Sequence, residues 1–195
     1  ISTNVKADIE VSTPTDLKNA IENASNGDVI TLKGTITLAS TDMPIFMFLD
    51  NSADSITLNL NGYDIQTTGT AQDGGSVNMM FGLLKGKLNV IGNGTIKTTT
   101  PSTFDLFRVM GSATPIADYT TLVIGENVTL DADQTTKGRC VQIYTNNAKR
   151  TVNGKTAYRT DIIGGSGGSS SHGFAYGVNV LVKGTLKSSI YCVQV

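Results

Sequence analysis

The chain has 195 residues, enough for a single domain with its own core, and its net charge of −1 makes nucleic acid an unexpected partner. Charged residues make up only 16% of the chain, below the roughly 25% typical of globular domains, and the abundance of Thr, Asn, Ser and Gly favours a secreted, cell-surface or virion protein. The apolar run at residues 43–49 is far shorter than the ~20 residues that cross a bilayer, so membrane insertion is not expected.

The N-terminal segment, residues 1–14, is predicted to lie at the edge of the domain. Val5, Ile9 and Val11 are expected to add an edge strand there. The chain begins with Ile1 rather than Met, so we expect a processed product or a part of a longer protein.

One short amphipathic α-helix is predicted over residues 15–26, with Thr15 or Asp16 as its N-cap and an Asn-Gly pair at its end. Its apolar residues recur at helical spacing and form one face: Leu17, Ala20, Ile21 and Ala24. A helix in this place is expected to cap the open end of the β core that follows.

A repeat begins after this helix. Five segments share an apolar strand, a Gly or Asn turn position and another apolar residue, with turns at Gly34, Gly62, Gly94, Asn127 and Gly184. These are residue types that tolerate a left-handed backbone. The turns recur about every thirty residues, which is typical of a solenoid. The last interval is nearly twice as long, so it holds either two coils or one coil with an insertion.

A second strand follows each turn, at residues 45–49, 77–84, 104–110, 139–144 and 190–195. The last two share the pattern Cys-Val-Gln-aliphatic, which indicates equivalent positions on different coils. Alternation along these strands predicts outward Arg108 and Gln142 between inward residues. The expected inward residues are Phe107, Val109, Val141 and Ile143.

The two cysteines, Cys140 and Cys192, stack about 4.8 Å apart if their coils are adjacent, which lies within the range of disulfide Cα separations. Their register predicts the outer face. Because parallel side chains are poorly oriented for a bond, free stacked thiols are the favoured interpretation.

Residues 145–176 interrupt the repeat. Asn153-Gly154 between β-forming residues predicts a hairpin, and the Gly/Ser-rich stretch 164–173 predicts a loop. A hairpin and loop that leave the solenoid are favoured over a degenerate extra coil. The candidate binding residues lie in or beside this excursion: Tyr144, Tyr158, His172 and Tyr176.

The predicted fold class is all-β, a right-handed parallel β-helix solenoid over residues 15–195 with a short N-terminal capping α-helix. The entry segments 16–21 and 26–32 and the coil segments 58–65 and 92–96 resemble the pectin-lyase-like β-helix superfamily, of the bacterial surface-protein or phage-fibre kind. The resemblance covers most of the chain from Thr15 onward. Members of that superfamily include polysaccharide lyases, hydrolases, surface proteins and phage fibres, so the resemblance implies the fold rather than one activity.

A lyase of this kind implies a carboxylate cluster for calcium and a basic residue on neighbouring coils. The best candidates are Asp131 and Asp133, with Asp105 and either Arg108 or Arg139. The equivalent positions on other coils are threonines, which favours a solvated turn over a catalytic or metal site: Thr37, Thr67 and Thr98.

A hydrolase of the polygalacturonase type implies a Gly-His-Gly motif with several aspartates. Here His172 lies in the Gly/Ser loop without an acid pair nearby in sequence, and an exposed loop histidine is favoured. No Gly-x-Ser-x-Gly elbow supports a serine nucleophile. Neither a metal nor a cofactor is expected.

The sequence therefore predicts a non-catalytic extracellular or virion-surface module for adhesion, glycan or partner binding, or structural spacing. A polysaccharide lyase or glycoside hydrolase and a phage fibre or decoration protein are the alternatives. The expected partner is a polysaccharide or host-surface ligand. The last strand carries no cap in the sequence, so self-association or further chain is expected at that end.

Overall fold

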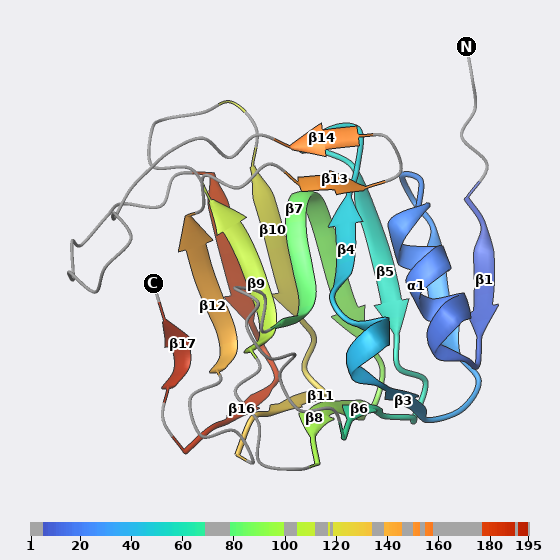
Figure 1. Ribbon diagram of the computed structural model, residues 1–195, viewed down its shortest axis with the longest axis vertical. Helices are drawn as coiled ribbons and strands as arrows, with labels where there is room; N and C mark the ends of the chain where they lie inside the picture. The colour runs from blue at the N-terminus through green and yellow to red at the C-terminus, as the bar shows by residue number, and fades with distance from the viewer. Residues whose placement is uncertain are drawn as a thin grey trace.

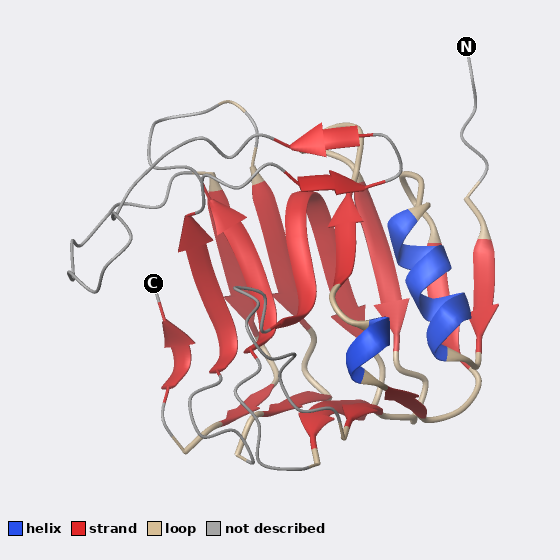
Figure 2. Ribbon diagram, viewed as in Figure 1, coloured by secondary structure: helices blue, strands red, loops and turns tan. Residues whose placement is uncertain are grey.

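The structure is a computed structural model, and it describes residues 6–68, 79–99, 105–111, 117, 119–133, 139–145, 150–152, 155–157, 177–189 and 191–194. This part of the chain is mostly β-strand, with one α-helix, α1 (Pro14–Glu22), and one 3-10 helix, η1 (Ser40–Asp42) (Figure 2). The prediction of an all-β chain with one short N-terminal helix is confirmed at this level.

Three sets of parallel strands surround the core (Figure 1). The ten-stranded sheet has two arms, which share the long strand β7 (Met79–Ile91). The first arm consists of β1 (Asp8–Val11), β2 (Val29–Leu32), β5 (Ser55–Asn59), the C-terminal half of β7, β10 (Thr120–Ile124) and β15 (Val178–Val182). The second arm consists of β4 (Ile45–Phe48), the N-terminal half of β7, β9 (Asp105–Gly111), β12 (Arg139–Thr145) and β17 (Tyr191–Gln194). The five-stranded sheet consists of β3 (Ile36–Leu38), β6 (Ile65–Thr67), β8 (Gly94–Thr98), β11 (Val128–Asp131) and β16 (Thr185–Lys187).

Each repeat of the chain contributes three strands in order: one to the first arm, one to the five-stranded sheet and one to the second arm. The strands of the following repeat pair in parallel with the corresponding strands of the repeat before it. Apolar side chains consequently lie in register from repeat to repeat. Three rows, one in each strand set, are Ile30, Leu58, Val90, Ile124 and Val182; Ile36, Ile65, Ile96, Leu130 and Leu186; and Ile45, Phe81, Phe107, Val141 and Val193. Each fully buried aliphatic side chain in these rows stabilises the fold by about 1.5–3 kcal/mol.

The aromatic pair Phe81 and Phe107 shows how closely the rows pack. Their rings are stacked with centroids 5.0 Å apart. Phe107, Val109 and Val141 are fully buried, which confirms their predicted inward direction, whereas Ile143 is partly exposed. Both Arg108 and Gln142 are less buried than these residues, as expected of side chains on the outer face.

Helix α1 covers the N-terminal end of the core beside β4 (Figure 1). Its N-cap is Thr13, whose Oγ1 accepts a hydrogen bond of 3.1 Å from the backbone N–H of Asp16. The prediction of Thr15 or Asp16 as the cap was therefore wrong, because Pro14 suits the first helical position and moves the start forward. The predicted apolar face is buried at Leu17, Ala20 and Ile21. Ala24 is buried too, but it lies beyond the C-cap Asn23, so the predicted helix end at the Asn-Gly pair was wrong.

Strand β1 occupies the free edge of the first arm and pairs in parallel with β2, so the predicted edge strand is present at residues 8–11. Val5 lies outside the described residues. Asp28 fixes the chain between α1 and β2, because its carboxylate accepts backbone N–H bonds from Ala7 at 3.1 Å and Ser25 at 2.8 Å.

The predicted ladder of left-handed turns was only partly right. Gly62 and Gly94 have positive φ angles, but Gly34, Asn127 and Gly184 do not. The residue that pairs with Gly94 is Val128 rather than Asn127. The predicted alignment of these two turns was therefore wrong by one residue.

Position 184 requires glycine because of a close approach to neighbouring backbone atoms, and not because of its φ angle. A Cβ atom there would lie 2.3 Å from the carbonyl oxygen of Val128 and 2.5 Å from that of Gly125. At Gly34, by contrast, an added Cβ would meet no atom within 4 Å. Glycine is thus needed at Gly184 because consecutive turns stack on one another, and this need is absent at Gly34.

The long interval before the last repeat holds one repeat with an excursion, since β10, β11 and β12 pair directly with β15, β16 and β17. Within the excursion, β13 (Arg150–Val152) and β14 (Lys155–Ala157) form an antiparallel pair around the Asn-Gly centre. The Gly/Ser-rich stretch 164–173 lies outside the described residues.

The predicted outward direction of the cysteines was wrong for Cys140, which has no solvent exposure. Its Sγ donates to the carbonyl oxygens of Lys187 at 3.0 Å and Leu130 at 3.5 Å, on the five-stranded sheet. The simple alternation fails here because the consecutive residues Cys140 and Val141 are both buried in the core.

We expect Gly184→Ala to destabilise the protein by about 1–3 kcal/mol, because the methyl group would overlap two carbonyl oxygens. Gly34→Ala is the matched control and should change the free energy of unfolding by no more than about 0.5 kcal/mol. Urea denaturation of both variants followed by circular dichroism measures the difference. Equal effects would contradict the turn stacking described above.

Candidate functional site

Asp105, the first residue of β9, is the centre of the deepest ionic cluster among the described residues. Its side chain is 1% exposed, and its carboxylate receives the Arg108 Nε at 2.7 Å and the Arg139 Nη1 at 3.3 Å. The backbone N–H of Arg139 donates to the same carboxylate at 3.1 Å. A buried carboxylate is stable only when its charge is compensated, so this cluster joins β9 to β12.

The other two candidate acids do not join this cluster. Asp131 lies 3.9 Å from Lys187 on the neighbouring strand, and its Oδ1 accepts a hydrogen bond of 3.1 Å from the backbone N–H of Asp133. The side chain of Asp133 is exposed. In the part of the chain that the structure describes, neither acid has a hydrogen bond or ion pair with Arg139, and no three His, Cys, Asp or Glu residues are grouped as metal ligands.

A polar row continues from this cluster along the second arm. Arg108 is in register with Gln142, and Gln142 is in register with Gln194. The Oε1 atoms of both glutamines and the Nε of Arg139 are buried without a hydrogen-bond partner. Because these atoms are closed off from solvent, the row does not present a charged surface for chemistry.

A second candidate lies on the outer face of the first arm. An open groove of about 510 Å³ follows the ends of β5, β7 and β10 and the turns after β10 and β15. Its lining consists of Thr57, Asn89, Ile91, Gly92, Val123, Gly125, Glu126, Asn127 and Lys183. We call these residues the first-arm groove.

The parallel register builds this groove. Thr57, Asn89 and Val123 are consecutive members of one outward row on β5, β7 and β10. Asn89 is oriented by a hydrogen bond of 3.2 Å from its Nδ2 to the carbonyl oxygen of Ile56, which leaves its Oδ1 available as an acceptor. Ile91, which is 42% exposed, adds an apolar surface beside this row.

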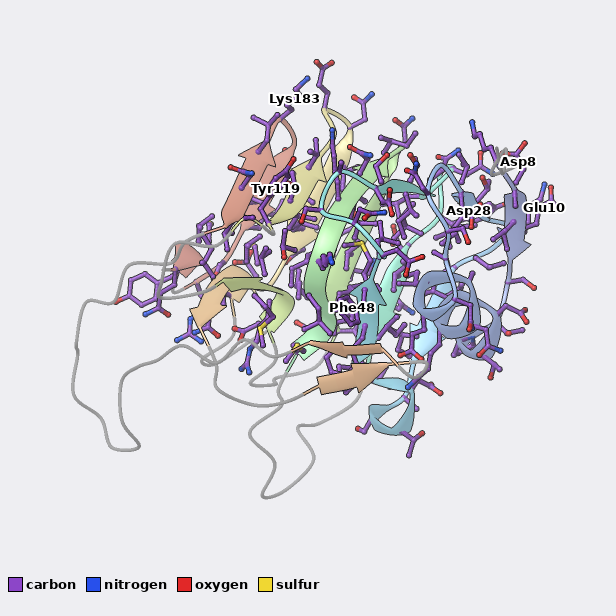
Figure 3. The ribbon with its side chains drawn as sticks, turned by 90° about the horizontal axis from the view of Figure 1, so that it is seen from above. Asp8, Glu10, Asp28, Phe48, Tyr119 and Lys183 are labelled. Atoms are coloured by element: carbon purple, nitrogen blue, oxygen red, sulfur yellow. The ribbon has the colours of Figure 1, made fainter. Side chains whose placement is uncertain are left out.

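The charges of the groove lie at its rim. Glu126 and Lys183 are exposed, and neither forms an ion pair with another described residue. Figure 3 shows Lys183 at the end of the first arm, well away from Asp8 and Glu10 at the N-terminal edge. The opposite charges cancel, so the groove offers an acid, an ammonium group, amides and a hydroxyl without a strong net field.

Sequence reasoning did not identify this groove, because its residues come from four segments and none forms a local motif. Alignment of the repeats by strand register, rather than by turn glycines, would have placed Thr57, Asn89 and Val123 together. Of the predicted binding residues, Tyr158, His172 and Tyr176 lie outside the described residues, as does the side chain of Tyr144.

Comparison with known proteins assigns neither a family nor a function to the chain. No family model, no curated protein and no solved structure matches the chain. The helices in the described ranges also include none that is long and apolar enough to cross a membrane.

Replacement of Asp105 should reveal the structural role of its cluster. Asp105→Asn removes the charge that two guanidinium groups share, and we expect a loss of about 3–5 kcal/mol in the free energy of unfolding. Asp133→Asn is the control, because its exposed carboxylate should contribute no more than about 0.5 kcal/mol. Urea denaturation measures both, and a stable Asp105→Asn variant would contradict the structural role.

Proposed function

We propose that the chain is a right-handed parallel β-helix that acts as a non-catalytic binding module on a cell or virion surface, and that the first-arm groove contacts a glycan. The main support is the groove itself, a shallow surface of amide, hydroxyl and aliphatic groups on a continuous parallel sheet. The in-register rows and the repeated three-strand order support the helical fold.

The absence of an acid and base pair in the described groove favours binding over turnover. Glycoside hydrolysis needs two carboxyl groups on either side of the scissile bond. The described lining of the groove holds one carboxyl group, that of Glu126. The other charged group of the lining is the Lys183 ammonium group, which cannot replace a second carboxylate. Asp105 is held by two arginines and is closed to solvent, so it is unsuited to proton transfer.

The groove chemistry matches the two kinds of surface on a sugar ring. Asn89, Asn127 and Thr57 can donate to and accept from hydroxyl groups, and Glu126 can accept from two of them. The C–H face of a pyranose can lie on Ile91 and Val123, which supply apolar area. A rigid scaffold with polar side chains at fixed spacing lowers the entropic cost of binding a flexible polymer.

A glycan array followed by calorimetry of the best ligand tests this proposal. We expect Asn89→Ala to weaken binding about tenfold, the effect of losing about 1.4 kcal/mol of hydrogen bonding. Gln66→Ala is the matched control, because Gln66 is a partly exposed amide on the five-stranded sheet and should leave affinity unchanged.

Incubation of the same ligands with the protein distinguishes binding from catalysis. New reducing ends or the absorbance of an unsaturated product, lost in Glu126→Gln, would replace the proposal with a lyase or hydrolase. Failure of all glycans to bind would also overturn the glycan assignment, as would equal weakening by Asn89→Ala and Gln66→Ala.

A further inference from the structure

Cys140 and Cys192 lie directly opposite each other on β12 and β17. Arg139 pairs with Tyr191 and Val141 pairs with Val193, which fixes the two cysteines as neighbours across the strand pair. Parallel strands lie about 4.8 Å apart, within the Cα separation that a disulfide accepts. Stacked side chains are poorly oriented for the bond, so its formation requires the partly exposed Cys192 side chain to rotate toward Cys140. Both residues are free thiols, and Cys192 lies close enough to contribute to the raised pKa of the Cys140 thiol.

The two thiols differ in access to solvent. Cys140 is fully buried, and burial raises the pKa of its thiol to about 12, with the neighbouring Cys192 adding to the effect. Cys192, on β17, is partly exposed. A dissolved reagent therefore meets Cys192 first, and Cys140 is protected until the site opens.

The last repeat is also the least buried part of the core. Val180, Val182 and Leu186 point toward the core but are only partly buried, unlike their counterparts in earlier repeats. Among the described strands, β17 pairs with β12 alone. A covalent link between β12 and β17 would therefore act beside the least buried of the described strand sets.

We propose that Cys140 and Cys192 form an oxidisable dithiol whose disulfide fastens the last repeat to the rest of the fold. The oxidant is a low-molecular-weight disulfide such as oxidised glutathione. This inference is independent of glycan binding, since neither cysteine lines the first-arm groove.

The reaction proceeds by two thiol–disulfide exchanges. The Cys192 thiolate attacks one glutathione sulfur, the glutathione disulfide breaks, and one glutathione leaves as a thiolate. Cys140 then gives its proton to water or hydroxide and attacks the Cys192 sulfur, which releases the second glutathione. The two protein thiols are oxidised by two electrons, and the added disulfide is reduced to two thiols.

Mass spectrometry of the intact 195-residue chain after incubation with oxidised glutathione tests the proposal without any substitution. We expect a product lighter by two hydrogen atoms, no titratable thiol in denaturant, and one cross-linked peptide pair containing Cys140 and Cys192. The urea midpoint of unfolding should rise on oxidation and return after dithiothreitol. The closing step should accelerate about tenfold per pH unit up to pH 9, because only the Cys140 thiolate attacks.

Two variants separate the steps. Cys140→Ser should accumulate the mixed disulfide of Cys192 with glutathione, whereas Cys192→Ser should leave Cys140 unmodified under native conditions. Two free thiols after prolonged incubation of the wild-type chain, or only mixed and intermolecular disulfides, would overturn the proposal. A disulfide that forms without raising the urea midpoint would overturn its fastening role.

Discussion

In-register stacking of apolar side chains is the constraint on which the rest of this structure depends. A residue such as Leu58 is buried only because Ile30 precedes it and Val90 follows it at the same place in neighbouring repeats. Any slip by one residue would turn these side chains to solvent. The same register brings turns into backbone contact, aligns Thr57 with Asn89 on the outer face and sets Cys140 opposite Cys192.

The distribution of charge follows from this arrangement. A parallel stack offers few places inside for an uncompensated charge, because each inward side chain packs against the side chains at the same position in the neighbouring repeats. Asp105 is accepted inside only with Arg108 and Arg139 on its carboxylate. Charged residues make up only 16% of the chain, so neutral side chains supply many of its polar groups.

The sequence predicted the positions of the helix and strands better than it predicted which of their residues pair and which are buried. Helical spacing identified the buried side of α1, and the apolar segments located the strands that follow each turn, because these signals are local. The turn alignment failed at Asn127 because strand pairing, which is non-local, decides that Val128 meets Gly94. Cys140 was placed outward because alternation puts consecutive residues on opposite faces, whereas Cys140 and Val141 are both buried in the core. The groove could not be predicted from local motifs, since its residues meet only through the register.

Solution NMR of the methyl groups tests the register most directly. The parallel register predicts nuclear Overhauser contacts that connect Ile30 to Leu58, Leu58 to Val90, Val90 to Ile124, and Ile124 to Val182 in one unbroken series. Contacts from Ile124 to a residue of the 145–176 excursion in place of Val182, or an antiparallel pattern between these strands, would contradict it.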